Sequence, residues 1–163
     1  MKQIVYLSLG ANVGDRGKNL RDAMAALGNA GVCVTRVSST YETEPVDYLD
    51  QPWFLNCAVE AETELKAVEL LHTLREIETQ MGSKKLVAKG PRLIDMDVLL
   101  YGNEVIYTAE LQIPHPRMQL RRFVLEPLAE IAPQVRHPAS GLTVSEMLAR
   151  TPDKSAVRLV TDI

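Results

Sequence analysis

Residues 90–100 read GPRLIDMDVLL, so two aspartates, Asp95 and Asp97, lie in an otherwise apolar run directly after Arg92. A carboxylate buried without a partner in such surroundings has a high desolvation cost, so a buried location requires a compensating cation. In a β-strand, side chains at positions i and i+2 share a face, which places the roots of these carboxylates roughly 6.5 to 7 Å apart. The spacing therefore predicts a strand whose carboxylates bind Mg²⁺. The alternative is an edge strand with a solvated face and no metal.

The strand with the two aspartates is the last element in a predicted series of strands and helices. Apolar residues at helical spacing predict helices at 20–27 and 67–81, and β-rich or alternating segments predict strands at 4–9, 32–38 and 54–62. The order β-α-β-β-α-β, with hairpin-like neighbours in the middle, favours an α+β fold over a parallel Rossmann sheet. We expect a ferredoxin-like antiparallel sheet flanked by helices, in an α/β/α sandwich. Two shorter helices are expected after it, at 121–129 and 143–150.

The length and composition indicate one globular domain, residues 1–163, that is able to bury a full core. The chain is 46% hydrophobic and 24% charged, with a net charge of -3, so no basic surface for nucleic acid is expected. No apolar stretch approaches the roughly 18 residues that span a bilayer, and the N-terminus does not resemble a signal peptide. Cys33 and Cys57 lie in strand-like segments without CxxC spacing. We therefore expect a reduced, cytoplasmic protein with two buried thiols and no membrane or nucleic-acid partner.

A basic loop leads into the acidic strand. It carries Lys84, Lys85, Lys89 and Arg92. Such cations can simply form surface ion pairs, which contribute at most about 1 kcal/mol each and need no function. Beside an acidic pair, however, they match the needs of phosphoryl transfer, in which carboxylates hold Mg²⁺ and Lys or Arg neutralises phosphate oxygens. Because no Walker loop or dinucleotide fingerprint is present, ATP binding would require another architecture.

Two further groups of residues are candidates for substrate contacts. His115, between two prolines and close to Arg117 and Arg121, could contact phosphate, although a histidine in a proline-rich loop is more often incidental. On the strand at 54–62, Phe54 and Asn56 share a face by period two. With an aromatic ring from Phe123, they could bind a flat heterocycle by stacking and directional hydrogen bonds. The alternative for both aromatic residues is core packing.

Together these segments resemble the 6-hydroxymethyl-7,8-dihydropterin pyrophosphokinase family of folate biosynthesis. The likeness covers nearly the whole chain in order and spacing. The segments that carry it are Leu9-Gly10-Ala11-Asn12, Ser38-Ser39-Thr40-Tyr41-Glu42-Thr43, Asp50-Gln51-Pro52 before Phe54-Leu55-Asn56, Gly90-Pro91-Arg92 with Asp95 and Asp97, Tyr101-Gly102-Asn103, Pro114-His115-Pro116, and 123–133.

The resemblance implies an enzyme that transfers the terminal pyrophosphoryl group of ATP to the hydroxymethyl oxygen of the dihydropterin, with AMP as the other product. It implies that Asp95 and Asp97 hold two Mg²⁺ ions that bridge the triphosphate, and that Arg92 acts with them as a catalytic residue. The residues that it implies for ATP binding are Glu78, Lys85, Arg92, His115 and Arg121.

The resemblance also implies a pterin site, in which Phe54 and Phe123 enclose the ring and Gly10 allows a close backbone approach. The residues that it implies for this site are Gly10, Thr43, Val46, Phe54, Asn56 and Phe123. The partners expected are therefore the small-molecule substrates ATP and 6-hydroxymethyl-7,8-dihydropterin, bound by a monomer. Two other classes stay open: a metal-dependent phosphoesterase, which would use water as its nucleophile, and a nucleotide sensor without turnover.

Overall fold

The computed structural model describes residues 1–46, 48–82 and 92–160, and over these residues the main element is a six-stranded antiparallel sheet. Strands β1 (Gln3–Ala11) and β4 (Phe54–Thr63) pair at its centre. Strand β5 (Asp95–Tyr101) pairs with the other side of β1. The far side of β4 pairs with β2 (Val32–Val37) and β3 (Thr40–Thr43), and β8 (Val157–Val160) pairs with β3. This arrangement confirms the predicted α+β fold of the ferredoxin-like kind.

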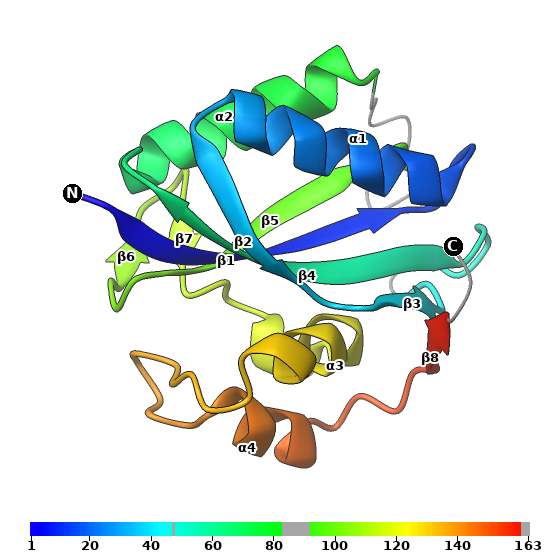
Figure 1. Ribbon diagram of the computed structural model, residues 1–163. Helices are drawn as coiled ribbons and strands as arrows, with labels where there is room; N and C mark the ends of the chain where they lie inside the picture. The colour runs from blue at the N-terminus through cyan, green and yellow to red at the C-terminus, as the bar shows by residue number, and fades with distance from the viewer. Residues whose placement is uncertain (47, 83–91, 161–163) are drawn as a thin grey trace.

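Helices cover both faces of the sheet (Figure 1). Helices α1 (Arg16–Asn29) and α2 (Ala67–Gln80) lie on one face. Helices α3 (Arg122–Ile131) and α4 (Val144–Arg150) lie on the other, after the short 3-10 helix η1 (Met118–Leu120). The short strands β6 (Ile106–Tyr107) and β7 (Gln112–Ile113) form a hairpin after β5. The predicted α/β/α sandwich is therefore confirmed.

Alternation along the strands sends apolar side chains into two cores. In β1, Val5, Leu7 and Leu9 are fully buried against α1 and α2, whereas Tyr6 belongs to the core under α3 and α4. Burial of each such leucine contributes about 1.5 to 3 kcal/mol relative to exposure. Because successive side chains point to opposite faces, Ser8 and Gly10 share the α3 side of the sheet with Tyr6. That side is the one on which polar side chains gather near the ends of β1, β4 and β5.

Local sequence signals explain where the helices begin and end. Asp15 caps α1 by accepting a hydrogen bond from the Lys18 backbone N–H at 3.1 Å. Thr143 and Glu146 form a reciprocal capping box at the start of α4. Helix α2 ends before Gly82, whose φ of 88° is a left-handed conformation that glycine adopts without steric cost. The predicted helices thus appear, with boundaries shifted by a few residues.

The strand predicted at 32–38 is confirmed as β2, and a separate short strand, β3, follows it before the long loop. Strand β2 ends at Val37, and the chain turns at Ser38, whose hydroxyl accepts a hydrogen bond from the Ala58 backbone N–H at 2.9 Å. Strand β3 then resumes pairing with β4. The prediction of two buried thiols is wrong for Cys33, which is exposed, and right for Cys57, which is buried. The reason is alternation: Val32, the neighbour of Cys33, points into the core, so Cys33 points outward.

Within the described ranges, none of the helices combines the length and the apolar character that a bilayer-spanning segment needs.

Candidate active site

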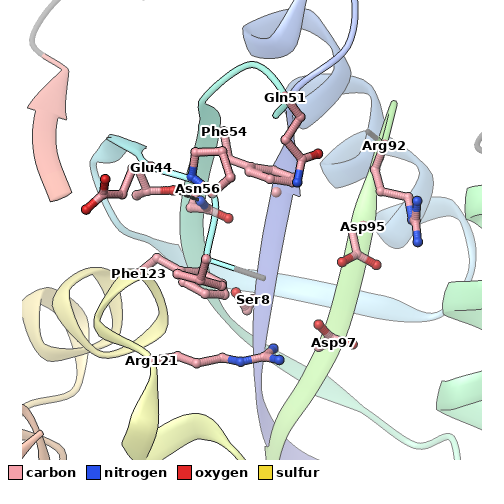
Figure 2. Close-up of a pocket in the computed structure, with 14 residues that line it drawn as sticks. Ser8, Glu44, Gln51, Phe54, Asn56, Arg92, Asp95, Asp97, Arg121 and Phe123 are labelled. Carbon is pink, nitrogen blue, oxygen red and sulfur yellow. Dashed lines mark hydrogen bonds between the residues drawn. The ribbon is translucent and has the colours of Figure 1, made fainter. Parts of the chain in front are cut away.

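The floor of the pocket that contains the two aspartates is built from small residues of the central strand β1. In the sheet register, Gly10 lies between Asp95 of β5 and Asn56 of β4, and Ser8 lies between Asp97 and Ala58. Adjacent strands are about 4.8 Å apart, so the backbones of Asp95 and Asn56, which are two strands apart, lie about 10 Å from one another on either side of Gly10. The small side chains in the middle leave a hollow between the larger residues on either side, and Figure 2 shows these residues around it.

Gly10 is needed for the packing of this floor. A Cβ atom at position 10 would overlap with Oδ1 of Asn56 and would also contact the Phe54 ring. The close backbone approach in the pterin site that the resemblance implies for Gly10 stays a prediction, and in the structure the Asn56 side chain lies against this position. Any larger residue at this position would therefore require the Asn56 amide to move.

One half of the pocket is aromatic and carries a directional amide. Phe54 and Phe123 lie above and below Asn56 in Figure 2. Asn56 is buried, and its Nδ2 donates a hydrogen bond of 2.5 Å to the buried hydroxyl of Thr43. This bond fixes the amide orientation, so the carbonyl oxygen is aimed away from Thr43. Val46 completes this side of the pocket. Two rings that flank an oriented amide suit a flat, polar-edged heterocycle.

The other half of the pocket is charged. Asp95 and Asp97 leave β5 on the face that carries Ser8 and Gly10, with Arg92 before them and Arg121 opposite (Figure 2). Burial raises the pKa of Asp97, and the charges of Arg75 and Arg121 oppose that shift. Arg121 also lies over the Phe123 ring, with its guanidinium carbon 5.6 Å from the ring centroid. Arg121 therefore stands at the junction of the aromatic and the charged halves.

Asn12, at the end of β1, holds the backbone of Arg92 in place. Its backbone N–H donates to the Arg92 carbonyl at 3.0 Å, and its Oδ1 accepts from the Arg92 N–H at 2.7 Å. Its Nδ2 donates to Gln51 Oε1 and to the Pro52 carbonyl, both at 2.9 Å. Because Asn12 is buried and both polar atoms of its side chain are bonded, it fixes Arg92 and the loop before β4 relative to each other.

Helix α2 supports the outer edge of β5 at the residue between the two aspartates. Glu78 Oε2 accepts a hydrogen bond from the Met96 backbone N–H, and Arg75 Nη1 donates to the Met96 carbonyl, both at 2.7 Å. Arg75 and Glu78 are also bonded to each other at 3.0 Å. Since β5 is an edge strand, its outward backbone groups need such partners. Glu78, implied as a nucleotide contact, thus binds β5 and is not among the residues that line the pocket.

His115 lies next to the charged half and is neutral. Its backbone N–H donates to the Leu99 carbonyl at 3.0 Å, and its Nδ1 accepts from the Arg117 backbone N–H at 3.2 Å. Burial, together with the charges of Arg121, Arg117 and Arg75, lowers the pKa of His115 to about 4. With Nδ1 acting as an acceptor, the proton of the neutral ring is on Nε2, which can donate a hydrogen bond. The arginines alone therefore carry the positive charge of this cluster at neutral pH.

The donor set suits a hard cation that is shared with a substrate. Asp95 and Asp97 supply carboxylate oxygens on one face of β5, and the described residues contain no cluster of three or more His, Cys, Asp or Glu side chains placed to hold a metal. Mg²⁺ is commonly bound by one or two carboxylates while substrate phosphates and water complete its coordination. The carboxylate pair therefore fits Mg²⁺ that is bound jointly with a phosphorylated ligand.

The pocket brings together most of the residues that the sequence singled out. It is lined by all six residues implied for the pterin and by Arg92, Asp95, Asp97 and Arg121. Lys85 lies outside the described residues. Sequence reasoning gave no site role to four other residues that line the pocket, Ser8, Glu44, Pro45 and Gln51, or to Asn12 and Arg75 beside it. Period-two alternation in β1 could have identified Ser8, because it is a polar residue on the same face as Gly10, whereas Asn12 and Arg75 act through contacts distant in sequence.

The C-terminal segment joins two walls of the pocket. Asp153 Oδ2 accepts a hydrogen bond from the Arg122 backbone N–H at 2.8 Å and so caps the start of α3, next to Phe123. Three residues later, Ala156 donates its N–H to Glu44 Oε1 at 2.6 Å and accepts from the Glu44 N–H at 3.2 Å. Glu44 lines the pocket beside Thr43. The segment therefore fixes the start of α3 relative to the loop after β3.

Comparison with known proteins identifies the family to which this site belongs. Residues 6–133 match the model of one protein family, described as 7,8-dihydro-6-hydroxymethylpterin-pyrophosphokinase (HPPK). The chain belongs to this family. The matched residues include every described residue of the pocket that the sequence predicted. The chain is therefore an enzyme of the pyrophosphokinase class, as the sequence resemblance indicated.

Relatives support the assignment over most of the chain. A 2-amino-4-hydroxy-6-hydroxymethyldihydropteridine pyrophosphokinase of Bacillus subtilis is 51% identical over 142 residues, which cover 86% of this chain and 85% of that protein. The folic acid synthesis protein fol1 of Pneumocystis carinii is 39% identical over 151 residues, 93% of this chain. This chain spans only 20% of that fungal protein. The family domain thus occurs both in a protein of similar length and inside much longer ones.

Solved structures confirm the fold at low sequence identity. The Plasmodium falciparum HPPK-DHPS structure with STZ-DHP superposes with a TM-score of 0.75 at 15% identity, covering 92% of this chain and 41% of that one. A structure of HPPK-DHPS in complex with substrates gives a TM-score of 0.71 at 14% identity, over 91% of this chain and 43% of that one. Because the sequence identity to these structures is low, their similarity supports the fold alone.

Proposed function

We propose that the protein transfers the pyrophosphoryl group of ATP to the hydroxymethyl group of 6-hydroxymethyl-7,8-dihydropterin, in a reaction that depends on Mg²⁺ and releases AMP. The proposal assigns the family's activity in folate biosynthesis to this chain as one pyrophosphokinase domain. The observation that carries it is the junction of two unlike half-sites in one pocket. An aromatic, amide-bearing half for a flat heterocycle opens directly onto a half with two carboxylates and two arginines.

In the aromatic half, Phe54 and Phe123 enclose the pterin ring and exclude water from its faces. The Asn56 amide, oriented by Thr43, binds the polar edge of the ring. The ring is thereby held with its hydroxymethyl group directed along the floor of Ser8 and Gly10, toward β5. Holding the acceptor hydroxyl in line with its target supplies a large part of the rate acceleration in transfers of this type.

In the charged half, Arg92 and Arg121 bind and neutralise phosphate oxygens, and the fork of a guanidinium suits bidentate contact. His115 donates a hydrogen bond from Nε2 to a phosphate oxygen, since its Nδ1 already accepts from the Arg117 backbone N–H. Asp95 and Asp97 hold Mg²⁺, and the chemistry that bound Mg²⁺ supplies is neutralisation and alignment of the triphosphate. The contact of Arg121 with Phe123 keeps this phosphate-binding group beside the acceptor.

The transfer itself exchanges one P–O bond for another. The hydroxymethyl oxygen attacks the β-phosphorus of ATP and forms a new P–O bond. The bond between the β-phosphorus and the oxygen that bridges it to the α-phosphorus breaks, and AMP leaves with that oxygen. The hydroxyl proton is released. The products are AMP and the pterin diphosphate in equal amounts.

The identity of the nucleotide product tests the proposal. We expect incubation with ATP, Mg²⁺ and 6-hydroxymethyl-7,8-dihydropterin to give AMP and pterin diphosphate in equal amounts, measured by ion-exchange chromatography and ³¹P NMR. ADP should not accumulate, because the bond between the α- and β-phosphates is the one that breaks. Omission of the pterin is the control. AMP formation that does not need the pterin would indicate a phosphoesterase, ADP would indicate a γ-phosphoryl kinase, and binding of ATP without any product would indicate a sensor.

The cap that Asp153 provides should matter for pterin binding. Asp153→Ala removes the hydrogen bond to the start of α3 and allows Phe123 to shift, so we expect pterin affinity measured by calorimetry to fall about threefold to tenfold. Thr143→Ala is the control, because it also removes a side-chain oxygen that caps a helix start, but on α4, which contributes no residue to the pocket. Each variant should lose about 1 kcal/mol of unfolding free energy, and only Asp153→Ala should weaken pterin binding. Equal pterin affinity in the two variants would show that the Asp153 cap has a purely structural role.

A further inference from the structure

Arg75 has a feature that its structural contacts do not explain. Its Nη1 makes all of the bonds that support β5, to Glu78 and to the Met96 carbonyl. Its Nη2 instead faces the candidate metal ligand Asp97, 3.6 Å from Oδ1. The two ends of one planar guanidinium thus serve different groups, and one of them lies beside the carboxylate pair.

The position of this guanidinium is well defined even though its side chain is 43% exposed. Met96, whose carbonyl it binds, is the residue between Asp95 and Asp97, so this hydrogen bond holds the guanidinium beside the carboxylates. The charge of Arg75 acts on Asp97, on Glu78 and on His115. Arg75 is therefore a fixed positive charge at the place where the carboxylates, the neutral imidazole and the phosphate-binding arginine Arg121 meet.

We propose that Arg75 couples metal binding to nucleotide binding. The inference rests on the proposed function, and it adds a residue to which no role in that function has been given above. In the metal-free site the Arg75 guanidinium neutralises Asp97, so a divalent cation that binds alone must approach against a fixed positive charge. When the cation comes with a triphosphate, the same guanidinium lies near phosphate oxygens and attracts them. Arg75 thus opposes the metal alone and favours the metal together with its nucleotide.

The two effects have opposite signs, and this makes the proposal testable. Arg75→Gln removes the charge and keeps an amide that can donate to Met96. We expect this variant to bind Mn²⁺ alone about tenfold more tightly than wild type, because the repulsion of a nearby unit charge is lost. Mn²⁺ binding is measured by electron paramagnetic resonance of the free protein. We expect it to bind the Mg²⁺ complex of α,β-methylene-ATP, in which the scissile bond cannot break, about tenfold more weakly by calorimetry.

Two control variants separate charge from structure. Arg75→Lys keeps the positive charge, so both affinities should stay within about threefold of wild type. Arg21→Gln removes the same charge from an exposed position of α1, the helix beside α2 on the same face of the sheet, and should change neither affinity because Arg21 is not among the pocket residues. Thermal melting of each variant shows whether the fold is kept, and Arg75→Met, which also removes the charge, tests the proposal if Arg75→Gln unfolds.

The outcomes distinguish this inference from the proposed function. If Arg75→Gln shifts both affinities in the same direction, or shifts neither, the coupling role is wrong while the proposed function stands. A loss of nucleotide affinity without a gain in Mn²⁺ affinity also overturns the coupling. If wild-type protein binds neither Mn²⁺ nor the Mg²⁺ complex of the analogue, it is the proposed function that fails.

Discussion

Replacement of Asp97 by alanine is expected to reduce turnover at least about a hundredfold, because the carboxylate pair on β5 would be left with one member to hold the metal. Asp97 lies on the pocket floor beside Ser8 and faces both Arg75 and Arg121. The measurement is the rate of AMP formation at saturating ATP and pterin. Asp95→Ala should have an effect of the same order. Activity of either variant above about a hundredth of wild type would contradict a shared metal site.

The loss of activity should occur without loss of stability. Burial raises the pKa of Asp97, so the folded state disfavours the charged form of this carboxylate. A raised pKa in the folded state means that stability is favoured at low pH and declines as the pH rises from the usual range of an aspartate through the raised value. Asp97→Asn keeps the shape, removes the charge and should lack this pH dependence. We therefore expect its free energy of unfolding at neutral pH, without metal, to equal or exceed that of wild type.

Asn56→Ala is expected to weaken pterin binding by about 1 to 3 kcal/mol, because the polar edge of the ring would lose its partner in a buried site. Isothermal titration of the pterin measures the loss. Binding of the α,β-methylene analogue of ATP serves as an internal control and should be nearly unchanged, since Asn56 lies across the floor from Asp95. Equal pterin affinity in the variant and in wild type would remove Asn56 from the proposed site.

Thr43→Val refines this prediction. The substitution removes the hydroxyl that accepts the 2.5 Å hydrogen bond from Asn56 Nδ2 and leaves the amide itself in place. Because the amide loses its orientation while keeping its polar atoms, the loss of pterin affinity should be smaller than in Asn56→Ala. A larger loss in Thr43→Val would indicate that Thr43, and not Asn56, makes the main contact with the ring.

The periodicity of the chain was enough to predict much of this architecture. Alternation in the strand that begins at Phe54 correctly placed Phe54 and Asn56 on one face, and the i, i+2 spacing placed Asp95 and Asp97 on one face of β5. Helical spacing predicted the main helices, and the order of elements predicted the antiparallel sheet. These predictions succeed because side-chain direction within one element depends on local backbone geometry alone.

The edges of the sheet were harder to predict. The separation of β2 from β3 depends on Ser38 bonding to Ala58 across the sheet, and the exposure of Cys33 depends on which face the helices cover. Strand β8 forms only because β3 offers a free edge to a segment more than a hundred residues later. No local sequence pattern predicts these pairings, because the strand that pairs with a sheet edge depends on how the rest of the sheet is assembled.

The sequence by itself determined which residue types the site contains and which faces of the strands carry them. Only the tertiary structure decided how those residues act on one another. It brought Arg75 of α2 to Asp97 of β5, bonded Asn12 to the backbone of Arg92, and placed the Arg121 guanidinium over Phe123. Such contacts join residues far apart along the chain, and their distances depend on how helices and strands pack, which local periodicity does not encode.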